Sequence, residues 1–436
     1  MELARNSGAS AVNAPIFLIG TLDTKGEEIE FIQECLAYFD LRCLVVDVGV
    51  LGEPQCPADV VRQEIARLGG SAIEDLVAKG DRGSAIVVMQ RGLAAWMRAQ
   101  AGAPPAGVLA IGGSAGTSLA GAGMRELPIG VPKVLVSTMA SGDVRPYVGS
   151  SDITMMYSVG DFTGLNRLTR RILRNAAGAV AGMCLAQRQT TIDPKTESDT
   201  MLVGVTMFGV TTPYVRQVQQ LLAGQGFEFL VFHATGTGGQ AMERLMTDGF
   251  IQASLDLTTT ELADELVGGV LSAGPHRLEE AGKLGIPQII SVGALDMVNF
   301  GSPDTVPPKF NGRTFYPHNP AVTLMRTTIE ENTELGQLIA RKANTAQGPV
   351  RILLPLRGVS AIDAEGKPFF DPLADKALFA AIRANLQKHV ELIELDLHIN
   401  DRAFAERTAC EFLSTVAEKR SQSNALATQK NCKEIE

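Results

Sequence analysis

Histidine, cysteine and tryptophan are scarce in this sequence, and their scarcity narrows the possible chemistry. The chain of 436 residues has five histidines, six cysteines and one tryptophan. No two cysteines have C-x-x-C spacing, and no cysteine–histidine group has the spacing of a zinc site. Scattered thiols in a chain of this length are typical of a reducing cytosol, so we expect a cytoplasmic protein without a disulfide framework.

Long apolar runs and blocks of like charge are also missing. The most apolar helical segment, residues 176–186, is too short to span a bilayer. The N-terminal segment MELARNSGASAVNAP lacks the apolar core of a signal peptide. The formal net charge is −9 without any lysine or arginine block, so the sequence predicts neither a membrane nor a nucleic-acid partner.

What the sequence does contain is a repeated alternation of short apolar runs and longer helical periodicities. This alternation predicts an α/β fold with mostly parallel sheets. In the first half, the expected strands are 16–20, 43–48, 85–89, 108–113 and 133–138, with a helix over 26–39. In the second half, the expected strands are 202–207, 227–236, 351–356 and 391–397, with helices near 212–224, 321–345, 372–388 and 401–418.

The polar segment 187–200 interrupts this pattern and is the best candidate for a linker. We therefore expect an N-terminal α/β subdomain over 15–190 and a C-terminal one over 200–418. The remaining residues, 419–436, are polar, and we expect a frayed tail there.

The two halves resemble each other. A shift of 186 residues places Ile19-Gly20 on Val205-Thr206, and GVPKVLVS at 130–137 resembles GIPQIISV at 285–292. The likeness predicts a diverged duplication: two Rossmann-like units with similar strand order, which face each other across a cleft. The alternative is that any two strand–helix–strand segments look alike. Ligands of open α/β sheets bind at the carboxyl ends of strands, so the loops there are the first candidates for a site.

The first such loop is GTLDTKGEE at 20–28. Gly20, Thr21, Asp23 and Lys25 place backbone, hydroxyl, carboxylate and ammonium groups next to a helix start, where a metal–phosphate pair could bind. The spacing is not that of a Walker A loop. The structural alternative is a helix capped by Asp23 or Thr24.

The second loop is GVLAIGGSAGTS at 107–118. Glycines permit close backbone approach, and a glycine-hydroxyl loop at a helix N-terminus attracts anions. The residues concerned are Gly112, Gly113, Ser114, Gly116 and Thr117. The pattern is not G-x-G-x-x-G, so it does not predict a Rossmann dinucleotide site, and a plain tight turn is the alternative.

The third loop, HATGTGGQAMERL at 233–245, repeats these features in the second half. Gly236, Thr237 and Gly238 make a second candidate anion cradle. Two glycine-hydroxyl loops, one in each half, predict a phosphate-bearing ligand between the units. Further along, Glu261 follows a threonine run and is expected to lie in the first turn of a capped helix.

A fourth cluster spans 291–320 and contains Asp296, Asn299, Arg313 and His318. A histidine with a carboxylate and an arginine could bind an acidic substrate or transfer protons. The alternative is a long irregular loop held by its polar side chains. Ser360 and Asp363, just after a predicted strand, could line the same cleft or form a turn.

Five segments taken together resemble the Tm-one-like ATP-binding domain family. They are LIGTLDTKGEEIEF, LAIGGSAGTSLA, FHATGTGGQAMERL, SVGALDMVNFG and FYPHNPAVTLMRTT, in this order, and the resemblance covers roughly residues 15–418. The family comprises the N-terminal domain of a plant tobamovirus-resistance protein and uncharacterised bacterial relatives. The resemblance implies ATP bound between two α/β subdomains, contacts from the loops at 20–25 and 112–117, and a homodimer.

Three functional hypotheses follow. In the first, ATP, with Mg²⁺, is used in chemistry on a small metabolite: Lys25 stabilises phosphate charge, Asp23 holds the metal, and His318 with Asp296 acts on the substrate. In the second, the protein is a non-catalytic, nucleotide-binding regulatory dimer. In the third, it is a metal-dependent lyase or hydrolase that does not use ATP, with a metal near His318 and Asp296.

Overall fold

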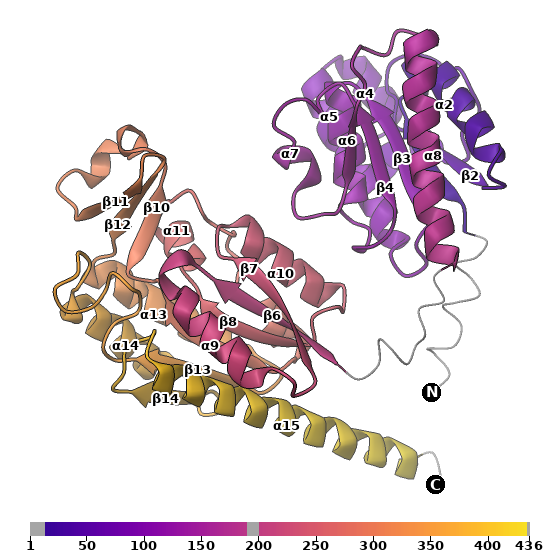
Figure 1. Ribbon diagram of the computed structural model, residues 1–436. Helices are drawn as coiled ribbons and strands as arrows, with labels where there is room; N and C mark the ends of the chain where they lie inside the picture. Colours follow the sequence, from indigo (N-terminus) through magenta and orange to yellow (C-terminus); the bar gives the residue numbers. More distant parts are fainter. Residues whose placement is uncertain (1–13, 190–199, 434–436) are drawn as a thin grey trace. The chain divides into compact units, whose positions relative to one another are not determined.

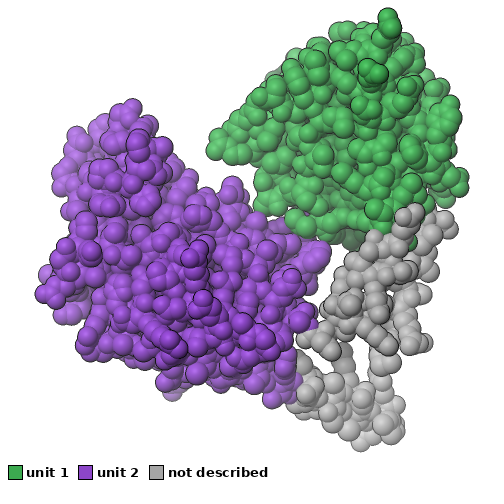
Figure 2. Space-filling view, in the orientation of Figure 1, with its two compact units in different colours: residues 1–194 green, residues 195–436 purple. Residues whose placement is uncertain are grey.

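The chain forms two compact units, residues 1–194 and 195–436, in the computed structural model (Figure 1, Figure 2). The structure describes residues 14–189 and 200–433, with side chains described to residue 422. The predicted linker therefore lies mostly outside the described residues. Among the described residues, no helix has both the length and the apolar character needed to cross a membrane. Each unit has its own hydrophobic clusters and is described by itself.

Unit 1 is built on a five-stranded parallel sheet with the order β2-β1-β3-β4-β5. The strands are β1 (Ile16–Gly20), β2 (Cys43–Asp47), β3 (Gly107–Gly112), β4 (Lys133–Ser137) and β5 (Thr154–Tyr157). The chain moves outward from β1 to β2 and then returns to the other side of β1. The gap between the carboxyl ends of β1 and β3 is therefore the topological switch point, where ligands of such sheets bind.

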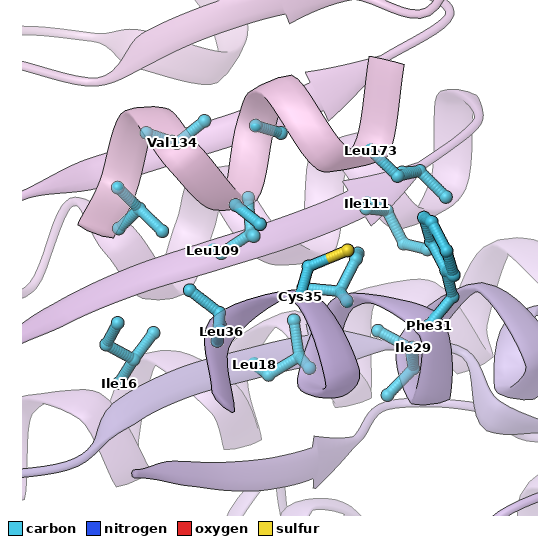
Figure 3. Close-up of a cluster of buried hydrophobic side chains, with 14 of the residues drawn as sticks. Ile16, Leu18, Ile29, Phe31, Cys35, Leu36, Leu109, Ile111, Val134 and Leu173 are labelled. Atoms are coloured by element: carbon cyan, nitrogen blue, oxygen red, sulfur yellow. The ribbon is translucent and has the colours of Figure 1, made fainter. Parts of the chain in front are cut away.

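Helices cover both faces of this sheet, which explains why its strands are apolar on both sides. Alternate residues of β1 point to opposite faces: Ile16 and Leu18 pack with α2 (Leu22–Ala37) and α8 (Arg167–Gln189), as Figure 3 shows in part. Phe17 and Ile19 pack on the other face. The remaining helices of unit 1 are α3 (Arg62–Leu68), α4 (Ile73–Lys79), α5 (Arg82–Ala99), α6 (Ser114–Met124) and α7 (Arg145–Val148).

Unit 2 has a six-stranded parallel sheet with the order β14-β13-β9-β8-β6-β7. Its strands are β6 (Met201–Met207), β7 (Phe227–His233), β8 (Ala253–Thr258), β9 (Gln288–Gly293), β13 (Val350–Pro355) and β14 (Glu391–Leu395). Its α-helices are α9 (Thr212–Leu222), α10 (Thr237–Thr247), α11 (Glu261–Val267), α12 (Glu280–Leu284), α13 (Ile329–Ala343), α14 (Pro372–Asn385) and α15 (Arg402–Lys433).

Between β9 and β13 the chain adds a small antiparallel sheet, β10-β12-β11, which Figure 1 shows at one end of unit 2. Its strands are β10 (Met297–Phe300), β11 (Phe315–Asn319) and β12 (Val322–Arg326). Three short 3₁₀ helices also belong to unit 2: Gly209–Thr211, Pro303–Thr305 and Pro308–Phe310. The segment 291–320, for which a long irregular loop was the structural alternative, thus contains the strands β10 and β11.

The predicted α/β fold with two parallel, Rossmann-like sheets is confirmed. In chain order, the first five strands of both sheets are arranged 2-1-3-4-5. The paired segments of the repeat occupy equivalent strands, and Lys133 and Gln288 each open the fourth strand as buried polar residues. This agreement supports the duplication, although the order is common among doubly wound sheets. The predicted cleft between the units stays a prediction.

Three element predictions were wrong. Residues 85–89 are helical rather than extended, because Asp81 caps α5 through the Gly83 amide at 3.0 Å and Ala85, Met89, Leu93 and Met97 form a buried stripe at helical spacing. The helix expected from residue 321 begins only at Ile329, after a capping box of Thr328 and Glu331. The last helix, expected to end at 418, continues to Lys433.

Candidate functional site

The loop after β1 is shaped by two aspartates. The Leu22 amide, which opens α2, donates to Asp47 Oδ1 at 3.1 Å. Asp23 accepts hydrogen bonds from the amides of Leu51 and Gly52 at 3.2 and 3.1 Å, and so holds the loop that follows β2. The N-cap position is Thr21, without a side-chain cap. The predicted capping role of Asp23 or Thr24 was therefore wrong.

Lys25 interrupts α2. Its backbone has φ −132° and ψ 16°, far from helical values, and the helix resumes after it. The Lys25 ammonium donates to the carbonyl oxygen of Phe162 at 2.6 Å. The Lys25 side chain, a cation in the first turn of α2, thus links this helix to the segment after β5.

The glycine loop after β3 is a tight strand-to-helix turn. A Cβ on Gly112 would lie 2.6 Å from the carbonyl carbon of Gly116, so only glycine fits there. Helix α6 begins at Ser114, and the first amides of a helix have no partners within it. Thr117 is fully buried, and its hydroxyl lies 2.5 Å from that of Ser137.

These two loops meet at one cavity of about 600 Å³ in unit 1, at the switch point between β1 and β3. It is lined by residues 21, 23–25, 48, 50, 51, 76, 80–82, 85, 86, 113–116, 119, 138, 139 and 161. Of the predicted nucleotide-binding residues in unit 1, those that line it are Thr21, Asp23, Lys25, Gly113, Ser114 and Gly116. Gly20, Gly112 and Thr117 are not in this lining.

The cavity is lined by both charged and apolar residues. Lys25 and Arg82 bring positive charge, and Asp23, Asp81 and Asp161 bring negative charge. Hydrogen bonds from Ser84 and Gly83 hold the pKa of the Asp81 carboxyl below its usual value. Apolar lining comes from Val48, Val50, Leu51, Leu76, Ile86, Leu119 and Met139. The first turn of α6 adds backbone amides and the positive end of a helix dipole.

Sequence reasoning missed Arg82, Asp161 and the apolar lining residues of this cavity. The mistaken strand at 85–89 hid the start of α5, where Asp81 and Arg82 lie. Asp161 follows β5, a strand that was not predicted. The residues at 48–51 and 138–139 follow β2 and β4, so the carboxyl-end rule applied to every predicted strand would have found them.

The third predicted loop already has an anion. Glu261 Oε1 accepts hydrogen bonds from the amides of Gly236 and Gly239 at 2.8 and 3.0 Å, and its side chain is fully buried. Adding a Cβ to Gly238 would place it 1.9 Å from the carbonyl oxygen of His233. An internal carboxylate thus occupies the cradle assigned to Gly236, Thr237 and Gly238, and we leave these residues out of the ligand site. Glu261 is bound to the glycine loop instead of simply starting a helix.

Arg277 fixes that carboxylate from the other side. Its guanidinium is fully buried and forms ion pairs with Glu261 at 2.7 Å, Asp256 at 2.5 Å and Glu243 at 2.9 Å. Burial lowers the pKa of Arg277, but the three carboxylates outweigh it and hold the pKa above its ordinary value. This cluster is a closed structural network.

The predicted pair of His318 and Asp296 was wrong. His318 is exposed on β11, whereas Asp296 is fully buried after β9 and accepts a hydrogen bond from Ser360 at 2.7 Å. No hydrogen bond or ion pair joins them among the described residues. Nor do the described residues include any group of three or more His, Cys, Asp or Glu placed to hold a metal ion. Arg313 pairs with Glu331, and the Asn299 amide donates to Asp264.

Asp296 instead belongs to a buried acidic cluster. Arg326 pairs with Asp375 at 2.6 Å and with Asp363 at 3.7 Å, and Asp296 faces the same group. Burial, together with the charge of Asp363, raises the pKa of Asp296 to about 7 and that of Asp375 to about 8. In this described region, Asp296 Oδ1 and Asp363 Oδ1 are buried without hydrogen-bond partners. One guanidinium thus serves three carboxylates.

The fold and the cavity define a protein of two doubly wound α/β units, the first with an open site at its switch point. The chain belongs to the uncharacterised protein family UPF0261: the model of its N-terminal domain matches residues 14–189 and that of its C-terminal domain residues 200–416. The resemblance read from the five sequence segments is thereby confirmed.

Relatives of this chain occur in bacteria and in tomato. A UPF0261 protein of Clostridium tetani is 50% identical over 90% of this chain and 97% of its own length. One from Rhizobium meliloti is 46% identical over 90% and 96%. The tomato mosaic virus resistance protein Tm-1 of Solanum lycopersicum is 40% identical over 97% of this chain, which spans only 59% of the tomato protein.

Proposed function

We propose that the cavity of unit 1 binds ATP. The observation that carries this proposal is the meeting of the loops 21–25 and 113–116 at the carboxyl ends of the adjacent strands β1 and β3. Each loop opens a helix at the topological switch point, where doubly wound sheets bind phosphate-bearing ligands.

The size and chemistry of the cavity suit a nucleotide. Its volume of about 600 Å³ falls within the usual range for small-molecule sites. Lys25, Arg82 and the amides at the start of α6 suit phosphate groups, and the apolar lining residues suit a base. Asp23 and Asp161 supply carboxylate oxygens, the ligand type that Mg²⁺ prefers, so we propose that the nucleotide binds with Mg²⁺.

Calorimetric titration of the full chain with ATP, with and without Mg²⁺, tests the proposal. We expect micromolar binding, weakened about tenfold or more in Lys25→Ala because a charge-assisted bond is lost. Gly113→Val is expected to abolish binding: a Cβ at Gly113 has its nearest neighbour, the Thr138 hydroxyl of the lining, at 3.9 Å, so we expect the larger side chain to enter the cavity.

Lys79→Ala and Gly102→Val are matched controls. Both positions lie in unit 1 outside the cavity lining, and a Cβ on Gly102 meets nothing within 4 Å. Both variants should bind ATP like the parent chain. Absence of ATP binding to the parent chain would refute the proposal.

The geometry favours a protein that binds the nucleotide without catalysing a reaction on it. The catalytic pair expected from His318 and Asp296 is separated, which removes the basis for the metal-dependent lyase or hydrolase. We therefore propose a cytoplasmic, homodimeric nucleotide-binding protein. Measurements of ADP release and of the molar mass in solution test this proposal. Steady ADP release would restore an ATP-using enzyme acting on a small metabolite.

Antiviral activity does not enter this proposal. The chain is 40% identical to the tomato resistance protein and 41% identical to a protein named for tomato mosaic virus susceptibility. Because the two identities are equal within a percent, overall similarity carries neither property to this chain.

A further inference from the structure

We infer that Glu28 is a positioning residue for the nucleotide site. It holds residues 158–164, which we call the β5–α8 segment, in place as a wall of the cavity. Lys25 then couples this segment to the bound phosphates. The inference rests on the proposed function and adds a residue that does not line the cavity.

The β5–α8 segment is tied down at its C-terminal end. The Phe162 side chain is buried in the cluster beneath α2 and α8. The Gly164 amide donates to Glu28 Oε1 at 3.1 Å, and the Phe162 carbonyl accepts from the Lys25 ammonium at 2.6 Å. Both partners belong to α2: Lys25 stands at the break in this helix, and Glu28 lies three residues after it.

Between these ties and β5, residues 159–161 are exposed, and the backbone is strained at Val159. Val159 has φ +63°, a left-handed conformation that is unfavourable for a β-branched residue, and its side chain is 60% exposed. Asp161, two residues further on, lines the cavity. Strained backbone persists where the surroundings hold it in place, and it gathers at ligand clamps.

Glu28 is a costly residue to place where it is. Glu28 is buried, with an exposed fraction of 1%. Removing a carboxylate from water has a large desolvation penalty unless the group is hydrogen-bonded. The bond to the Gly164 amide compensates this cost and sets the height of the segment against α2. The Lys25 ammonium has three N–H groups, of which the Phe162 carbonyl uses one. The other two N–H groups can donate to a phosphate, so the same ammonium contacts both the nucleotide and the β5–α8 segment.

Hydrogen exchange of the full chain with and without Mg²⁺ and ATP gives the first test. We expect amide exchange in residues 158–164 to slow when ATP binds, because the phosphates fix Lys25 and Lys25 fixes the segment. The expected loss of this response in Lys25→Met, measured at ATP saturation, places the coupling at the ammonium.

Calorimetry of Glu28 variants gives the second test. We expect Glu28→Ala to bind ATP about tenfold more weakly, since an untethered wall must be ordered during binding. Glu28→Gln, whose amide oxygen can still accept the Gly164 N–H, should restore affinity. Glu34→Ala removes an exposed carboxylate from the same helix and should bind normally.

The outcomes separate this inference from the proposed function. ATP binding with unchanged exchange in 158–164 and unchanged affinity of Glu28→Ala would overturn the positioning role and leave the nucleotide site intact. No ATP binding by the parent chain would overturn both. If Glu28→Ala does not fold, Glu28→Asp, whose shorter side chain withdraws the carboxylate from the Gly164 amide, takes its place, and normal ATP affinity of that variant would overturn the positioning role.

Discussion

At the scale of the residue, unit 2 is organised by two arginines, each surrounded by carboxylates. Arg277 has a bonded partner for each of its three acidic neighbours, whereas Arg326 leaves carboxylate oxygens of Asp296 and Asp363 without hydrogen bonds in the described structure. Sequence reasoning selected Asp296 because aspartate near histidine suggests catalysis. It also placed Ser360 and Asp363 near Asp296, which the structure bears out. It did not find Arg326 and Asp375, because these residues come from other parts of the chain.

Replacing Arg277 tests the closed network. Arg277→Met leaves three carboxylates buried without their cation, so we expect the free energy of unfolding to fall by about 3–5 kcal/mol. Urea denaturation followed by circular dichroism measures the change. Arg402→Met, which removes an exposed pair with Glu406, should change it by less than about 0.5 kcal/mol. Equal effects of the two substitutions would contradict the network.

The cluster around Arg326 predicts a pH dependence of stability. The folded pKa values of Asp296 and Asp375, about 7 and about 8, lie above the ordinary value of 3.8. The folded state therefore binds more protons than the unfolded state between these values, and the contribution of these groups to stability is lost as pH rises from about 4 to about 8.

Asp296→Asn should flatten this dependence, because the amide stays neutral throughout. Urea denaturation at intervals from pH 5 to pH 9 measures it, with the exposed Asp396→Asn as the control. We expect the unfolding midpoint of the parent chain to decrease with pH in this window and that of Asp296→Asn to decrease less. Identical slopes would show that Asp296 does not hold the proton.

At the scale of the element, the site depends on how strands pass into helices. The apolar runs of β1 and β3 were predictable because buried parallel strands carry continuous hydrophobic residues. Helix α5 was mistaken for a strand because its apolar run, AIVVM, is short and rich in valine, and only the longer stripe through Met97 reveals the helical period. The helix predicted from residue 26 begins where α2 resumes after the break at Lys25, but the hydrogen bond from Lys25 to the Phe162 carbonyl could not be predicted, because the two residues are distant in the sequence.

Neighbouring glycines in the loop after β3 should respond differently to substitution. Gly112→Ala forces a Cβ to within 2.6 Å of the backbone of Gly116, and we expect the free energy of unfolding to fall by about 1–3 kcal/mol. Gly113→Ala meets no such contact and should leave stability within about 0.5 kcal/mol. Thermal and urea denaturation compare them; a tolerated Gly112→Ala would contradict the tight turn.

At the scale of the whole molecule, the two units share strand order but differ at the switch point. In unit 1 the loops leave a cavity. In unit 2 the equivalent loops close up: the hydroxyls of Thr211 and Thr258 lie 2.7 Å apart, and Phe369 packs with Val210 and Met297 above them. The sequence predicted the shared architecture, but it could not predict which unit is open, because that depends on side chains from the added sheet and from the loop after β13.

Ligand binding should therefore stabilise the units unequally. At an ATP concentration of 100 times the dissociation constant, we expect unit 1 to gain about 2.7 kcal/mol against unfolding. Hydrogen exchange resolved by peptide should show added protection in β1 and β3 and none in β8 and β9. Equal protection of both sheets would place the ligand elsewhere.

The Glu261 carboxylate in the glycine loop of α10 bears on the number of ligands that each chain binds. The sequence contains two glycine-hydroxyl loops, and their pattern predicts that both contact one phosphate-bearing ligand. Because the internal Glu261 carboxylate fills the loop of unit 2 in the folded chain, only the loop of unit 1 is open to a ligand. A titration with ATP should therefore reach a stoichiometry of one ATP per chain. Relatives that keep a glutamate at this position should show the same stoichiometry.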